Sequence, residues 1–156
     1  MMKEWLVPIV SAALGSLSFA MFFGVRSRKL WFSLLGGVLN WGLYLLAMKK
    51  MGLPATMAYA LGAAAGTLYA EILARIVKTP VTVFVITSVI PMVPGGALYY
   101  TMLGLLQGDK ATFVDRGLYT LSAAGAMALG IFAATMLFRL LFTVGRAVCS
   151  AVRRAH

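Results

Sequence analysis

The fold is decided by the stretch Val83-Phe-Val-Ile-Thr-Ser-Val-Ile-Pro-Met-Val-Pro-Gly-Gly-Ala-Leu-Tyr-Tyr-Thr-Met102. It is apolar enough to lie in a membrane, but two prolines and a glycine pair interrupt it at Pro91–Gly96. Because proline has no N–H, the carbonyls of Thr87 and Ile90 lose the hydrogen-bond partners that a continuous helix would give them. The stretch therefore predicts a helix that is broken near its middle.

The composition is that of an integral membrane protein. Of the 156 residues, 62% are hydrophobic and 12% are charged, and the mean hydropathy is +0.92. Soluble domains are about half apolar and about a quarter charged, so a soluble enzyme, a disulfide-rich secreted module and a disordered tail are excluded. Segments long enough to cross a bilayer, at about 20 residues each, cover residues 5–24, 30–48, 55–74, 81–107 and 118–137.

These segments predict an all-α membrane protein, because backbone in lipid must satisfy its own hydrogen bonds. We expect one domain over residues 1–156 with about five transmembrane helices, the fourth of which is broken. A basic tail over 139–156 should place its arginines at the lipid headgroups. Nine of the 14 Lys and Arg residues lie in the first loop, the third loop and this tail, which favours an external N-terminus and a cytoplasmic C-terminus.

The sequence lacks the residue patterns that are typical of metal sites, nucleic-acid binding and enzymatic catalysis. Cys149 is the single cysteine and His156 the single histidine, so the sequence holds no Cys/His cluster for a metal. The net charge of +10 is typical of loops beside apolar spans, and we expect no nucleic-acid partner. No Ser/His/Asp grouping or phosphate-binding loop occurs in the sequence. We therefore predict neither an enzyme nor a cofactor.

The predicted break is the first candidate site. Half-helices over about 81–90 and 97–107 would meet near the bilayer midplane, where free carbonyls attract a cation and free amides an anion. A zwitterionic amino acid fits both poles, and broken helices build substrate sites in many secondary transporters. The alternative is a proline kink that packs against neighbouring helices. The candidate substrate-binding residues are Thr87, Ser88, Pro91, Pro94, Gly95, Gly96, Tyr99 and Tyr100.

Three further features lie in the second and third segments. Glu71 is the only acidic residue within a predicted span, which makes it a candidate proton or cation group, although an ion pair with Arg75 four residues on is the alternative. Asn40 could hydrogen-bond to another helix or to substrate, and we favour the helix. Gly62 and Gly66 form a small-residue stripe suited to close helix packing.

These residues also carry a family resemblance. The stretch Tyr69-Ala-Glu-Ile-Leu-Ala-Arg75, Pro80 and the Val83–Met102 stretch with its Ile-Pro-x-x-Pro-Gly core resemble the bacterial threonine/serine exporter family. Length and layout are similar to the small stand-alone membrane component of that family. The resemblance implies proton-driven export of threonine, serine or a similar small metabolite across the bacterial cytoplasmic membrane.

The resemblance further implies a partner. Long-chain members carry two membrane halves, and this chain resembles only the second, so a larger five-helix component would supply the first and give an inverted repeat. Pairing between copies of this chain stays open. Two alternative functions also stay open, namely a subunit of a dicarboxylate (succinate-type) exporter and a non-transporting accessory membrane subunit.

Overall fold

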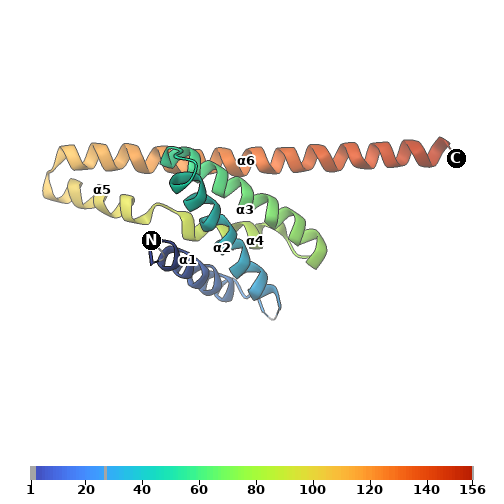
Figure 1. Ribbon diagram of the computed structural model, residues 1–156, viewed down its shortest axis with the longest axis horizontal. Coiled ribbons are helices and arrows are strands. Elements are labelled where there is room, and N and C mark those ends of the chain that lie inside the picture. Colours follow the sequence, from blue (N-terminus) through green and yellow to red (C-terminus); the bar gives the residue numbers. More distant parts are fainter. Residues whose placement is uncertain (1–2, 27, 156) are drawn as a thin grey trace.

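The computed structural model describes residues 3–26 and 28–155, which form helices joined by short connections (Figure 1). The described part contains no strand. The elements are α1 (Lys3–Phe22), α2 (Arg28–Lys49), α3 (Ala55–Val77), α4 (Val81–Val89), the short 3-10 helix η1 (Ile90–Met92), α5 (Gly95–Gln107) and α6 (Lys110–Ala155).

Four of these helices, α1, α2, α3 and α6, are long and apolar enough to cross a membrane, and α4–η1 with α5 forms a bent pair that can serve as a fifth span. The predicted all-α membrane fold with a broken fourth segment is confirmed. The two halves of that segment bend by 55°. A bend below 90° sends α5 onward instead of back toward its starting side, and in Figure 1 the chain continues from α4 through η1 to the far end of α5.

The fifth segment differs from its predicted bounds. Helix α6 begins at Lys110 and not near residue 118, because the connection is a tight turn at Gly108 and Asp109. Gly108 takes the left-handed conformation with φ 70°, which ends α5. Asp109 then caps α6, since its carboxylate accepts hydrogen bonds from the Thr112 amide at 3.1 Å and the Thr112 hydroxyl at 2.6 Å. Charged residues that suggested a loop are therefore the first turns of a helix.

The backbone of the basic tail is also helical. Helix α6 has 46 residues, about 69 Å at 1.5 Å per residue, whereas the hydrocarbon core is about 30 Å thick. No turn separates residues 139–155 from the preceding span, so the tail is not a separate segment lying in the interface. Figure 1 shows the last part of α6 projecting beyond the other helices, and α5 lying beside its first part.

Helix α3 is at the centre of the bundle and contacts α2, α4 and α6. Its contact with α6 is close because Gly130 has no side chain, and a methyl group there would collide with the Ala60 carbonyl oxygen. On the other side of α3, the Tyr59 ring lies 4.7 Å from that of Tyr44 on α2. This packing fixes α3 against both α6 and α2.

Candidate functional site at the helix break

The start of α5 leaves backbone donors open. The Gly95 amide donates to the Val93 carbonyl at 2.7 Å, and the Leu98 amide donates to the Pro94 carbonyl at 3.1 Å. Between them, the amides of Gly96 and Ala97 have no acceptor in the part of the chain that the structure describes. Gly95 and Gly96 are exposed, and a Cβ added to either would meet no atom within 4 Å. The break therefore presents an uncovered, electropositive helix end.

The end of α4 is more fully satisfied than the sequence predicts. The Ile90 carbonyl accepts from the Val93 amide at 3.1 Å, and the Ser88 carbonyl accepts from Nδ2 of Asn40 on α2 at 2.9 Å. The Thr87 hydroxyl donates to the Val83 carbonyl at 2.9 Å within its own helix. At this junction the buried hydroxyl of Ser88 and the Oδ1 atom of Asn40 lack a hydrogen-bond partner in the described residues.

Asn40 joins the break to the small-residue stripe of α3. A Cβ at Gly66 would lie 2.9 Å from Asn40 Nδ2, and a Cβ at Gly62 would lie 3.0 Å from Asn40 Oδ1 and 2.7 Å from Met92 Cε. The two glycines therefore leave the space that Asn40 needs to reach the Ser88 carbonyl. Three residues singled out separately in the sequence thus lie together at one junction with the break.

Glycines of α1 and α2 also pack against the end of α4 and against η1, and the sequence analysis did not predict these contacts. The hydroxyl of Ser88 fits against Gly36, and that of Ser16 fits against Gly37 next to it, because side chains at these glycines would collide with the hydroxyls. Gly15 of α1 faces Pro91, whose ring lies 3.6 Å from an ideal Cβ at that glycine. The signal available in the sequence was the Gly36–Gly37 pair in the second apolar segment.

Glu71 lies away from the break, beside the start of α4. It is buried, with 6% of its side chain exposed, and its Oε2 pairs with Arg75 at 2.5 Å. The Arg75 guanidinium also donates to the Glu71 backbone carbonyl at 2.7 Å and covers the Phe138 ring at 4.3 Å. The alternative interpretation of Glu71, an ion pair with Arg75, is therefore present in the structure.

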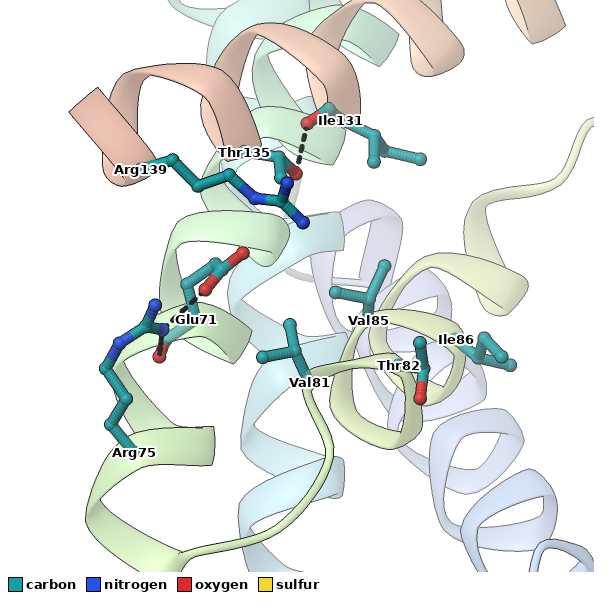
Figure 2. A pocket seen from close by; sticks show the side chains of 9 residues that line it. All are labelled: Glu71, Arg75, Val81, Thr82, Val85, Ile86, Ile131, Thr135 and Arg139. Carbon is teal, nitrogen blue, oxygen red and sulfur yellow. Dashed lines mark hydrogen bonds and ion pairs between the residues drawn. The ribbon is translucent and has the colours of Figure 1, made fainter. Parts of the chain in front are cut away.

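Glu71 and Arg75 line a cavity of about 360 Å³ between α3, α4 and α6. Their ion pair lies on the wall of this cavity (Figure 2). Val81 and Val85 line its α4 side, and Arg139 of α6 reaches into it. This cavity could not be predicted from the sequence, because residues of three separate helices form it.

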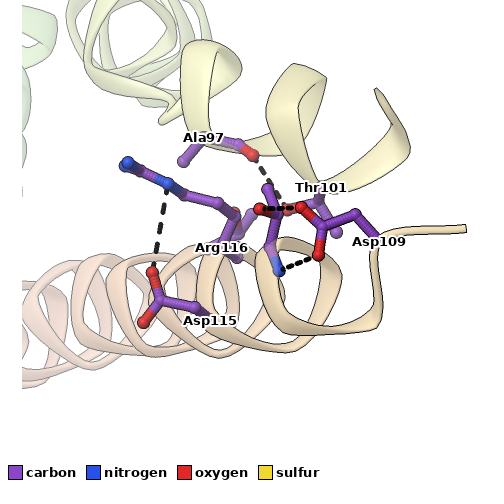
Figure 3. Close-up of polar contacts among 7 residues, drawn as sticks. Ala97, Thr101, Asp109, Asp115 and Arg116 are labelled. Carbon is purple, nitrogen blue, oxygen red and sulfur yellow. Dashed lines mark hydrogen bonds and ion pairs between the residues drawn. The ribbon is translucent and has the colours of Figure 1, made fainter. Parts of the chain in front are cut away.

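The tyrosines of α5 lie on an exposed face of the helix. Tyr99 and Tyr100 are 62% and 52% exposed, and their rings stack on each other edge to face at 5.4 Å. Thr101 faces inward and donates its hydroxyl to the Ala97 carbonyl at 2.8 Å, as Figure 3 shows beside Arg116. The Arg116 guanidinium lies 6.0 Å from the centre of the Tyr100 ring. The tyrosines are therefore exposed, whereas Ser88 is buried.

Comparison with known protein families identifies the family of this chain. A protein-family model described as "Threonine/Serine exporter, ThrE" matches residues 8–137, which include every helix junction described above. The chain belongs to the threonine/serine exporter family. No curated protein and no solved structure matches the chain. As a member of this exporter family, the chain is a multi-pass membrane protein concerned with transport.

The described part of this exporter component contains no group of three or more His, Cys, Asp or Glu side chains that could hold a metal ion. The chemistry at its break is that of backbone dipoles and hydroxyl groups. Such groups bind and orient a small polar solute without forming covalent bonds to it.

Proposed function

We propose that this chain is one half of a proton-coupled exporter of threonine, serine or a similar small amino acid. The observation that carries the proposal is the family match over residues 8–137 together with the open helix end at Gly95–Gly96. The substrate carboxylate binds the free amides of Gly96 and Ala97, where the helix dipole favours an anion. The buried Ser88 hydroxyl has no hydrogen-bond partner among the described residues, and in a state of the transport cycle that opens its contact with Gly36 it accepts a hydrogen bond from the substrate ammonium.

The larger component of the same exporter supplies the rest of the site. Support comes from the exposure of Gly95 and Gly96, because a transporter site at membrane depth needs walls on all sides and this chain provides one wall. With the bent pair counted as one span, the chain has five spans and its ends lie on opposite sides. Such a unit pairs naturally with a five-span unit of reversed orientation. The N-terminus is then external and the C-terminus cytoplasmic, in the bacterial cytoplasmic membrane.

Glu71 is the proposed proton-coupling group. Among Glu71, Asp109 and Asp115, only Glu71 is buried, while the two aspartates are exposed at the α5–α6 turn. A buried carboxylate at membrane depth is costly and is usually retained for ion or proton transfer. Its ion pair with Arg75 provides a partner from which it can be released during the transport cycle.

The test of the substrate site compares two glycines. In Gly96→Leu, added bulk should block approach to the α5 amides and abolish threonine efflux from cells that also express the larger component. The chain should still fold, because a Cβ at residue 96 meets no atom within 4 Å. Gly42→Leu on α2 is the matched control, since a Cβ there also meets open space. Normal efflux by a Gly96→Leu protein present at wild-type amounts would refute the site.

The test of the partner uses the chain by itself. We expect cells that express this chain without the larger component to show no threonine efflux above background, since half of the site is then missing. Full-rate efflux by the chain alone would show that the exporter is not split between two components.

A further inference from the structure

The cavity beside Glu71 contains more positive charge than the protein neutralises. It has a volume of about 360 Å³ and is lined by three charged side chains, Glu71, Arg75 and Arg139. One carboxylate and two guanidinium groups leave the cavity with a net charge of +1. A small-molecule site commonly has a volume of about 300–1,000 Å³, so the cavity is large enough to receive a ligand.

The two arginines differ in their surroundings. Arg75 is paired with Glu71, and its guanidinium lies over the rings of Phe138 and Phe142 at 4.3 and 4.9 Å. Arg139 has no carboxylate within ion-pair distance in the part of the chain that the structure describes. Figure 2 shows its guanidinium turned into the cavity, toward the side on which Glu71 lies. Arg139 is exposed, so its guanidinium is accessible to an oxyanion that accepts two parallel hydrogen bonds.

Glu71 offers the complementary group. Its Oε2 is engaged by Arg75, while its Oε1 has no hydrogen-bond partner among the described residues. The Arg139 guanidinium, from α6, and the Glu71 carboxylate, from α3, thus lie on facing walls of the cavity. A ligand with a carboxylate at one end and an ammonium group at the other satisfies both.

We propose that this cavity is a second binding site, in which a small zwitterionic amino acid places its carboxylate on Arg139 and its ammonium group on Glu71 Oε1. The site lies at the end of α3 that carries Arg75 and Lys78, the cytoplasmic end in the proposed orientation. It captures the substrate before export, so the inference rests on the proposed function. Helix α4 connects the two sites, because Val81 lines the cavity and the break begins at the other end of this nine-residue helix, about 13 Å away.

The experiment measures initial rates of threonine uptake into inside-out membrane vesicles that contain both exporter components. Arg139→Gln should raise KM by about tenfold or more, the effect of losing one charge-assisted hydrogen-bond pair, and should leave the maximal rate within about twofold. Arg139→Lys keeps the charge without the fork and should give an intermediate KM. Arg116→Gln, the same substitution on the exposed first part of α6, is the matched control and should leave KM unchanged.

Two additional measurements identify the chemical group that Arg139 binds. 3-Hydroxybutyrate keeps the carboxylate and lacks the ammonium group, so it should inhibit uptake by the wild type and not by Arg139→Gln. Reconstitution into vesicles without anionic lipid tests a headgroup phosphate as the partner, and loss of the KM difference there would overturn the proposal. A wild-type KM in Arg139→Gln would also overturn it. Absence of uptake by the wild type would instead contradict the proposed export function itself.

Discussion

Replacing Asn40 by alanine should destabilise the junction between α2 and the helix break. Asn40 Nδ2 is the hydrogen-bond donor to the buried Ser88 carbonyl, at 2.9 Å, and alanine leaves that carbonyl without a partner. Leaving a buried acceptor unpaired costs about 1–3 kcal/mol. Interhelical hydrogen bonds in membrane proteins have averaged about 0.6 kcal/mol and reached about 1.7. We therefore expect a loss of about 1–2 kcal/mol in the free energy of unfolding.

The matched control for this substitution is Ser33→Ala. Ser33 is fully buried on the same helix, but its hydroxyl has no hydrogen-bond partner in the described residues, so its removal should cost almost nothing. The free energy of unfolding is measured by reversible titration with sodium dodecyl sulfate in mixed micelles, followed by tryptophan fluorescence. Equal unfolding midpoints for Asn40→Ala and Ser33→Ala would refute the reasoning, because the Asn40–Ser88 bond would then contribute nothing.

Two further predictions concern α3 and its neighbours. Gly130→Ala should lower the unfolding midpoint in the same titration, because the new methyl group collides with the Ala60 carbonyl, while Gly125→Ala on the same helix meets open space and should be neutral or stabilising. Equal midpoints would contradict the close α3–α6 contact. Glu71→Gln should abolish proton-driven threonine efflux but preserve threonine–threonine exchange, and retention of proton-driven efflux would exclude Glu71 as the coupling group.

The sequence predicts the break well because its cause is local. Pro91 removes a backbone donor wherever the chain lies, and the structure contains the interruption at that position, with η1 between α4 and α5. The Glu71–Arg75 ion pair is equally local, since residues four apart share a helical face. Both features follow from covalent chemistry and helix geometry within a few residues.

The parts that the sequence did not predict depend on tertiary contacts or on a cap. The Asn40–Ser88 hydrogen bond joins residues 48 positions apart, and no spacing rule connects them. The placement of Arg139 beside Glu71 requires the packing of α6 on α3. The early start of α6 did have a local signal, the capping of the helix by Asp109. This capping signal was overlooked, because several charged residues at the end of a span usually indicate a loop.

The central claim is that the break at Gly95–Gly96 is a water-accessible substrate site within the membrane. The most direct measurement is the labelling of Gly96→Cys by a membrane-impermeant thiol reagent, in a Cys149→Ser background and with the proposed larger component present. We predict that the thiol is labelled and that threonine protects it, while Gly42→Cys shows no protection. A Gly96→Cys thiol that is never labelled, or whose labelling threonine does not change, would contradict the account.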